Sequence, residues 1–280
     1  MPRTIRIASV NVNGVRAAYR KGMGDWLETR GVDVLALQEV RATRADLEPL
    51  IGDGWHLVND ETTAKGRAGV AIASRLPIVE SRTAFGADEF DSAGRWIEAD
   101  VDVDGTPLTV ASVYVHSGEA DTPKQDEKWK FLDALATRLP ELAERGRVVL
   151  LGDFNVGHTE LDIKNWRGNR KKAGFLPGER AYFDRFFGEI GSEVTCVDGT
   201  VGTGLGWVDV GRRLSGEVEG PYSWWSNRGQ AFDNDTGWRI DYHIATPLLA
   251  ARASNYLIDR AASYDARWSD HAPVVADYEI

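Results

Sequence analysis

The feature that most constrains this chain is a set of short apolar runs that end in polar residues. The segment VVLLGDFNVG, residues 148–157, begins with four apolar residues and ends in Asp153, Phe154, Asn155 and a glycine-closed turn. Such a run is typical of a buried strand. Buried polar groups need partners, because leaving them unpaired is costly. A side-chain-capped turn is one explanation for the carboxylate and the amide, and a functional site is the other.

The same arrangement recurs along the chain. The polar residues at the ends of apolar runs are Asn11 and Asn13, Glu39, Tyr114, Asp153 and Asn155, Asp241, and Asp270 with His271. Each has a local explanation, such as an ion pair between Glu39 and Arg41 or a hydrogen-bonded core position for His271. Strand ends are, however, where a rigid sheet presents functional groups to a cleft. Their recurrence therefore favours one shared site.

The apolar pattern also predicts the secondary structure. Strands are expected at 4–11, 32–38, 68–74, 94–103, 107–115, 147–152, 239–245 and 272–279. The clearest helix follows Thr122-Pro123, an N-cap with proline at the first helical position, and Pro140 is expected to kink or end it. Shorter helices are expected at 17–29 and 179–187, and long loops at 199–237.

The order of these elements predicts one domain over residues 1–280, because no low-complexity linker interrupts it. The stretches IASVNVNG and LLGDFNVG echo each other, as strands that end in asparagine-containing turns. This echo suggests two similar halves with both turns at one edge. Strands mixed with helices favour an α/β fold in which two sheets pack face to face, with helices outside.

The composition limits where the chain works. Its mean hydropathy of −0.34 and the lack of a long apolar run argue against a membrane span. No signal-peptide pattern precedes the first expected strand. A single cysteine, Cys196, allows neither an intramolecular disulfide nor a zinc cluster, and we expect a reducing cytoplasm.

The net charge of −10 has the wrong sign for a nucleic-acid binder. Net charge, however, bears on solubility more than on any one face of a protein. Basic residues are dense in RAAYRK and in NWRGNRKK, where a solvated surface is the simpler interpretation.

The residue types at the strand ends suit metal-assisted chemistry on phosphate. Glu39 and Asp270, with the amide oxygen of Asn11, form an all-oxygen ligand set suited to Mg²⁺ or Mn²⁺. Asp153 and Asn155 are counted as further candidate ligands.

The remaining polar groups suit hydrolytic attack. Asp153 could orient or deprotonate a water molecule while Asn155 holds it. An Asp241–His271 pair keeps an imidazole charged to stabilise developing negative charge, and Tyr114 adds a donor. Metal-assisted phosphodiester hydrolysis needs these parts. The sequence contains neither the G-x-S-x-G motif of serine hydrolases nor a P-loop.

The motifs closely resemble those of the exonuclease III family of abasic-site endonucleases, within the endonuclease/exonuclease/phosphatase superfamily. They include NVNGVRA, LALQEVR, GRAGVAIASR, LLGDFNVGHTELDIKN, GNRKKAGFLPGER, YSWWS, GWRIDY and SDHAPV, and their order agrees from about residue 4 to 279. GDFN and SDHxP occur across the superfamily. GWRIDY together with DIKN and GNRKKAGF is more specific to the abasic-site branch.

The resemblance implies a DNase I-like, four-layered α/β sandwich with the site at one edge of both sheets. It implies that Glu39 is the principal metal ligand and that Asp153 activates the attacking water. It further implies that Asp241 and His271 face the scissile phosphate, with the Tyr114 hydroxyl as their partner. Whether one metal ion acts or two stays open.

The resemblance also implies a DNA-binding surface. Trp224, Trp238 and Ile240 would form a pocket for a flipped-out sugar without its base, whereas Trp225 is expected in the core. The phosphate contacts would be Arg16, Arg67, Arg170, Lys171 and Lys172. Such contacts orient a duplex without reading its sequence.

One departure from the family pattern follows the strand that ends at Tyr114. The family usually has a polar amide two residues after SVYV, where this chain has His116 and then Ser117. His116 is expected either to replace the amide or to lie on the surface. We expect Ser117→Ala to change activity only modestly; a loss as large as that of Asp153→Asn would show that an essential donor has been missed.

The sequence thus predicts a Mg²⁺-dependent DNA-repair nuclease that cuts 5′ to abasic sites and leaves a 3′-hydroxyl. Activity as a 3′-5′ exodeoxyribonuclease and in 3′-end cleaning is expected as well. Its partner would be duplex DNA with abasic sites or 3′ ends, and the chain would act as a monomer without a membrane. Two alternatives are a phosphoesterase for lipid or inositol phosphates and an inactive damage-binding scaffold.

Overall fold

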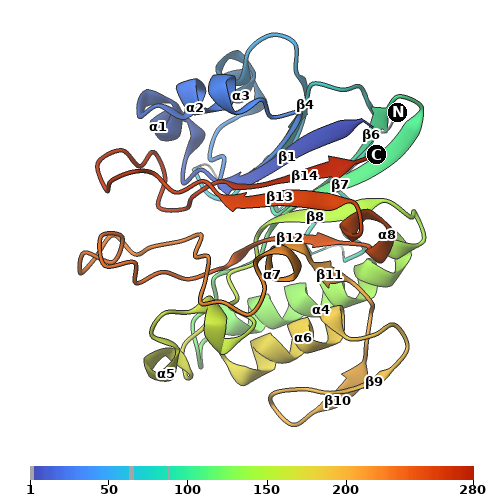
Figure 1. Cartoon of the computed structure of the whole chain (residues 1–280), viewed down its shortest axis with the longest axis vertical. Helices are drawn as coiled ribbons and strands as arrows, with labels where there is room; N and C mark the ends of the chain where they lie inside the picture. The colour runs from blue at the N-terminus through green and yellow to red at the C-terminus, as the bar shows by residue number, and fades with distance from the viewer. Residues whose placement is uncertain (1–2, 63–65, 88, 92) are drawn as a thin grey trace.

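Two six-stranded sheets face each other in the computed structural model, which describes residues 3–62, 66–87, 89–91 and 93–280 (Figure 1). The first sheet has the order β13 (Ala253–Ile258), β14 (Val274–Glu279), β1 (Thr4–Asn11), β2 (Val34–Gln38), β4 (Val70–Ser74) and β3 (His56–Asp60). The second has the order β11 (Val208–Asp209), β12 (Asp241–Ala245), β8 (Val148–Asp153), β7 (Thr106–Tyr114), β6 (Trp96–Val103) and β5 (Ile78–Arg82). A separate hairpin joins β9 (Glu193–Thr195) to β10 (Val201–Thr203).

The two large sheets repeat one pairing pattern. In each, a central parallel pair is flanked by antiparallel strands, and β1 with β2 corresponds to β8 with β7. The strands β1 and β8 carry the echoing stretches of the sequence. The expectation of two similar halves with both turns at one edge is therefore confirmed.

Helices cover the outer face of each sheet (Figure 1). The first is covered by α1 (Val15–Arg20), α2 (Met23–Arg30) and α3 (Arg44–Ile51), and the second by α4 (Pro123–Ala143) and α6 (Pro177–Phe187). The shorter helices are η1 (Glu160–Asp162), α5 (Trp166–Asn169), α7 (Val210–Ser215) and α8 (Pro247–Ala250). Within the described ranges, no helix is both long and apolar enough to cross a membrane.

Burial on both faces explains the near-continuous apolar runs. Along β1, Ile5 and Ile7 point into the core between the sheets, whereas Ala8 and Val10 pack against the helices. All four side chains are buried. A strand buried on both sides loses the alternation of apolar and polar residues that marks a half-exposed strand. The four-layered α/β sandwich expected from the resemblance is confirmed.

Two helix predictions need correction. The helix expected over 17–29 is two helices, α1 and α2, because Gly22 between them has a φ of 109°. Of the two outcomes expected at Pro140, a kink or an end of the helix, the end is wrong, because α4 continues to Ala143. Leu139 and Leu142 on either side of the proline are fully buried, so packing outweighs the lost hydrogen bond.

The expected strands are all present, with ends shifted by a residue or two. The sequence did not predict β3, β5, β9, β13, α3, η1, α5 or α8, and the segment expected as loops contains β10, β11 and α7. The strands β3, β5 and β13 lie at sheet edges. Edge strands bury less and therefore carry a weaker apolar signal, as the mostly exposed β5 illustrates.

Candidate active site

The strand ends named in the sequence meet at one edge of both sheets. Asn11 ends β1 beside Gln38 of β2, and Tyr114 ends β7 beside Asp153 of β8. Asp241 begins β12 directly opposite Asp153. This edge lies opposite the chain ends, at the left of Figure 1, where the loops before β12 and β14 project.

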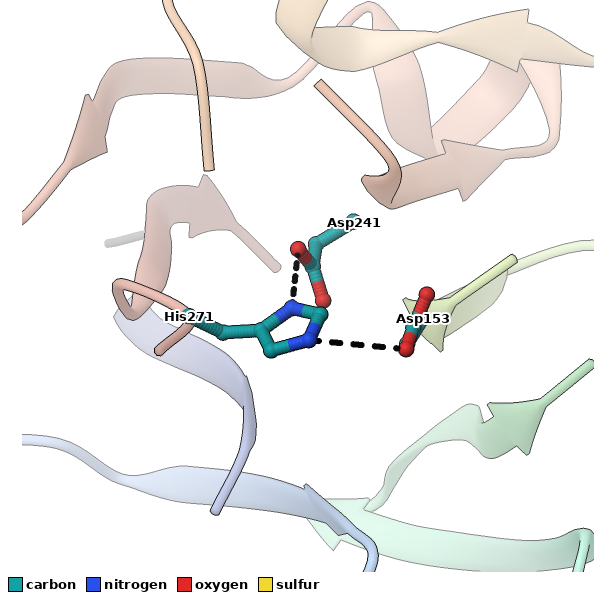
Figure 2. A group of neighbouring side chains, drawn as sticks. All are labelled: Asp153, Asp241 and His271. Atoms are coloured by element: carbon teal, nitrogen blue, oxygen red, sulfur yellow. Dashed lines mark hydrogen bonds and ion pairs between the residues drawn. The ribbon is translucent and has the colours of Figure 1, made fainter. Parts of the chain in front are cut away.

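An imidazole lies between two carboxylates at the centre of this edge (Figure 2). His271 Nδ1 is 2.9 Å from Asp241 Oδ2, and His271 Nε2 is 3.7 Å from Asp153 Oδ2. All three side chains are buried. The Ser223 hydroxyl donates to the same Asp241 oxygen at 2.6 Å, which fixes the carboxylate that holds the imidazole.

Burial and charge act in opposite directions on this group. Burial alone would lower the pKa of His271, but Asp241 and Asp153 raise it to about 10. Burial raises the pKa of Asp153, and Asp241 and Glu39 add to the increase while His271 opposes it. The direction of the pKa shift of His271 thus favours the charged imidazole that was predicted for the Asp241–His271 pair.

Ligand atoms of Asp153, Asp241 and His271 lie within 4.8 Å of one another, a spacing that could hold a metal ion. The hydrogen bond between His271 and Asp241 occupies one potential ligand atom of each. We therefore interpret this pair as a hydrogen-bonded dyad, which leaves the neighbouring oxygens as the candidate metal ligands.

The amide of Asn11 joins the two sheets at the site. Its Nδ2 donates to Glu39 Oε1 at 2.8 Å and to Asp153 Oδ2 at 3.0 Å. The other Glu39 oxygen pairs with Arg41. This is the ion pair that the sequence analysis gave as a local explanation for Glu39. Glu39 thus forms that ion pair and also borders Asp153.

Asp270 lies on the other side of the β1 turn. It accepts from Asn13 Nδ2 at 2.9 Å and from Trp224 Nε1 at 3.1 Å. Burial opposes these partners, but together with His271 they lower the pKa of Asp270. Asp270 is therefore an anionic group that is hydrogen-bonded both to the turn after β1, at Asn13, and to Trp224.

The echoing turns share a local geometry. Asn13 N donates to Asn11 Oδ1 at 3.0 Å, and Asn155 N donates to Asp153 Oδ1 at 2.9 Å. Asn13 and Asn155 both have positive φ, a conformation that asparagine tolerates. The sequence offered two explanations for these polar residues, a capped turn and a common location. The residues form capped turns and also lie together.

Tyr114 borders the acidic groups and packs against an arginine that the sequence did not single out. The Arg95 guanidinium lies 4.7 Å from the centre of the Tyr114 ring, and Nη1 donates to the Tyr114 carbonyl at 3.1 Å. Burial and the nearby Glu39 and Asp153 raise the pKa of Tyr114. Arg95 precedes β6, and nothing in its local sequence distinguishes it from a surface arginine.

The expected pocket residues lie together beside the dyad. The Trp224 and Trp238 rings are perpendicular, with centres 6.0 Å apart, and both are half-buried. The Trp224 ring centre is 6.4 Å from that of His271. Ile240 is almost fully buried, and Trp225 is in the core as expected.

The basic residues border two separate clefts. Arg16 and Arg67 line one of about 420 Å³, together with Arg41. Arg170 and Lys171 line another, of about 950 Å³. Lys172 is exposed nearby in the sequence, and Arg16 already pairs with Asp46 at 3.4 Å.

His116 lies at the departure from the family pattern and is partly buried. Its ring packs with Phe90 and Phe131, at centre distances of 5.8 and 5.6 Å, so it is not an exposed surface residue. Burial lowers the pKa of His116 to about 3, which keeps it neutral. Ser117 is exposed.

Comparison with known proteins extends these findings. A model of the Endonuclease/Exonuclease/phosphatase family matches residues 8–271. The exodeoxyribonuclease of Bacillus subtilis is 32% identical over 273 residues, which cover 96% of this chain and 98% of that protein.

Solved structures are similar as well. A 3′-5′ exonuclease from Neisseria meningitidis has a TM-score of 0.81 and 29% identity, covering 99% of this chain and 100% of that chain. An AP endonuclease from Archaeoglobus fulgidus has a TM-score of 0.80 and 26% identity with the same coverage.

Proposed function

Because the chain belongs to the endonuclease/exonuclease/phosphatase family, we propose that it is a DNA-repair nuclease. It hydrolyses the phosphodiester bond 5′ to an abasic site in duplex DNA. The similar proteins are an exodeoxyribonuclease, a 3′-5′ exonuclease and an AP endonuclease. The proposal therefore includes 3′-5′ exodeoxyribonuclease and 3′-end-cleaning activity, since the same attack on phosphorus serves each reaction.

One observation carries this proposal. Asp153 accepts a hydrogen bond from Asn11 of the opposite sheet and also faces His271, which Asp241 holds. The residues that we propose as the base for water, the donor for phosphate and the group that orients this donor are thus in contact.

Asp153 is the residue that accepts a proton from the attacking water, at Oδ2. The water oxygen bonds to phosphorus while the bond from phosphorus to the 3′ oxygen of the preceding nucleotide breaks. That oxygen takes a proton from solvent and becomes a 3′-hydroxyl, and a 5′-phosphate stays on the abasic sugar. Asn155 orients Asp153, because its backbone N–H donates to Oδ1 at 2.9 Å.

His271 and Tyr114 stabilise the phosphate as its charge redistributes. Asp241 holds His271 through Nδ1 and leaves Nε2 directed toward Asp153, where the phosphate would lie. The Tyr114 hydroxyl is a second donor on the same edge. Donors already in place at the developing charge need no reorganisation during the reaction.

The donor set at this edge fits a divalent cation. Glu39 and Asp153 both contact one Asn11 amide, so their negative charges are close together. Carboxylate and amide oxygens are the ligands that Mg²⁺ prefers. Glu39, Asn11 and Asp270 would hold Mg²⁺, or Mn²⁺ in its place, with Asp153 and Asn155 as further ligands. When bound, the ion would offset negative charge on the phosphate.

The lesion is recognised beside the dyad. Trp224, Trp238 and Ile240 accept the sugar of the abasic nucleotide, and aromatic walls of this kind exclude a nucleotide that keeps its base. The phosphate contacts are Arg16, Arg67, Arg170, Lys171 and Lys172. The protein works as a monomeric single domain in the cytoplasm, which agrees with its one cysteine being a free thiol.

An end-labelled duplex with one reduced abasic analogue tests the function, with Mg²⁺ and then with EDTA, beside an intact duplex. The reduced analogue cannot undergo β-elimination. A Mg²⁺-dependent product that ends in a 3′-hydroxyl at the lesion is the expected result. Shortening of both duplexes from their 3′ ends without an internal cut would restrict the activity to an exonuclease and contradict the pocket. No cleavage by folded protein would contradict the proposal and favour lipid phosphates or a scaffold.

A further inference from the structure

A lysine with no exposed surface lies behind the site. Lys128 of α4 is 0% exposed, as is the Glu179 side chain with which it pairs at 2.6 Å. Its ammonium also donates to the carbonyl of Asn155 at 2.8 Å and to that of Ser117 at 3.3 Å. An ammonium has three donors, and these three acceptors match them.

The three acceptors belong to three different segments. Ser117 follows β7, Asn155 follows β8, and Glu179 belongs to α6. Glu179 is itself held by Gln125 Nε2 at 3.0 Å and by the backbone N–H of Leu176 at 2.9 Å. Lys128 therefore links the two loops that follow the central strands of the second sheet to a helix beneath them.

The buried Lys128–Glu179 ion pair carries a cost in free energy that apolar packing would not carry. A buried ion pair often contributes less stability than apolar side chains of similar volume, because both charges lose their hydration. A methionine would fill the position of Lys128 without that cost. What a methionine would not supply is a donor for the two loop carbonyls.

The carbonyl of Asn155 belongs to the residue that orients Asp153. The Asn155 backbone N–H donates to Asp153 Oδ1, and its Nδ2 donates to the carbonyl of Val115 at 2.9 Å. Lys128 thus donates to the carbonyl of the same residue whose backbone N–H donates to Asp153.

We propose that Lys128 and Glu179 are positioning residues for the reaction, which hold Asn155, and through it Asp153, in the geometry for attack on phosphorus. This inference rests on the proposed nuclease function. A displacement of about 1 Å in a reacting group can lower a rate by about 100-fold. Loss of the pair should therefore lower turnover more than it weakens DNA binding.

The test compares two double variants, each of which replaces both charged residues of an ion pair that involves α4. The variant Lys128→Met with Glu179→Gln removes the loop donor and leaves no unpaired buried charge. The control variant is Arg138→Met with Glu98→Gln, which removes an α4 ion pair of 2.7 Å whose Glu98 is likewise 0% exposed. Among the described residues, Arg138 and Glu98 bond to each other and to Arg82, Trp96 and Glu141, none of which lies in the site loops.

The expected result on the reduced abasic duplex is a kcat about 10- to 100-fold lower for the Lys128 variant, with KM changed less than about twofold. The control should keep the wild-type kcat, although its melting temperature falls. Equal kcat for the Lys128 variant, its control and the wild type would overturn the inference.

A double-mutant cycle separates positioning from general destabilisation. In an Asp153→Asn background, the Lys128 variant should cost little further kcat, because the base that the pair is proposed to position is already lost. Independent, multiplicative losses would mean that the pair serves only the fold.

Amide hydrogen exchange tests the positioning even if the wild type cuts no DNA. The Asn155 amide should exchange faster in the Lys128 variant than in the control, with the amides of β8 unchanged. Unchanged exchange at Asn155 would overturn the inference. Cleavage by the wild type, measured separately, decides the proposed function, so the two failures are distinguishable.

Discussion

Asp153 uses its two carboxylate oxygens for different contacts. Oδ1 accepts the N–H of Asn155 and closes the turn, whereas Oδ2 faces Asn11 and His271. An asparagine keeps an oxygen for the turn but loses the basic group that would take a proton. The turn and the proposed chemistry can therefore be separated by one substitution.

Asp153→Asn should lower cleavage of abasic DNA by about 100- to 10,000-fold, the range typical of a lost general base. Binding of abasic duplex should stay within a few-fold of wild type. Single-turnover kinetics and fluorescence anisotropy measure the two quantities. Asp184→Asn, which changes a carboxylate paired with His158 instead, is the control. An equal collapse of binding would show that Asp153 serves the fold or the metal.

A second prediction for a single residue concerns Trp238, whose ring forms one wall of the proposed sugar pocket. Trp238→Ala should reduce the preference for abasic over intact duplex by about tenfold, as a hot-spot aromatic would. The ratio of kcat/KM for the two duplexes measures this preference. Trp26→Ala, which removes a half-buried ring packed on Trp268, should leave the ratio unchanged. An unchanged ratio for Trp238→Ala would remove the pocket assignment.

At the scale of elements, an ion network anchors the start of β12. Arg239 is 1% exposed, and its Nε and Nη2 donate to Asp162 and Asp209, each at 2.7 Å. The Arg239 backbone N–H also donates to the Asp162 carbonyl. This network fixes η1 and β11 against the segment that carries Trp238 and Asp241.

The network gives stability a defined dependence on pH. Burial alone would raise the pKa of Asp162, but Arg239, hydrogen bonds and Arg212 lower it from 3.8 to about 2. A carboxylate with a lowered pKa stabilises the fold above its unfolded pKa and loses that contribution as pH falls through its folded pKa. Asp162 should therefore contribute about 2 kcal/mol at pH 6 and progressively less between about pH 4 and 2.

Urea unfolding of wild type and Asp162→Asn at several pH values measures this contribution. The difference in unfolding free energy should be largest near pH 6 and shrink toward pH 3. Arg3 and Asp104 form an exposed pair, so Asp104→Asn should show little difference at any pH. A constant difference for Asp162→Asn would contradict the assignment of its charge.

The element scale also shows what the sequence could predict. The positions of Glu39 and Asp153 were predictable because each stands at the carboxyl end of a strand with a strong apolar pattern, whereas Asp241 begins the strand that pairs with Asp153. Lys128 was not, since a lysine in an amphipathic helix ordinarily faces water and its partners Asn155 and Glu179 are remote in sequence. The three-residue and two-residue strands β10 and β11 were missed because so few residues establish no period.

For the whole molecule, charge distribution matters more than the total of −10. Two clefts combine basic and acidic residues, namely Arg16 and Arg67 with Asp46 and Glu61 in one, and Arg170 and Lys171 with Asp121 and Asp126 in the other. Basic groups are therefore present at the proposed phosphate contacts beside acidic neighbours. Each phosphate contact releases condensed counterions. Binding of abasic duplex should therefore weaken steeply as salt increases, despite the acidic total.

The slope of log Kd against log salt concentration measures this effect. Substitution of both Arg170 and Lys171 by glutamine should lower the slope by about two contacts, with little change in cleavage of bound DNA. Lys130→Gln, at an exposed residue paired with Glu127, is the matched control. A flat salt response of the wild type would mean that the basic stretches are only solvated surface.

The repeated pairing of the two sheets has a further consequence. Asn11 and Glu39 come from one sheet and Asp153 and Asp241 from the other, so neither repeat contains a complete site. The distance between the groups from the first sheet and those from the second is therefore set by how the two sheets pack against each other.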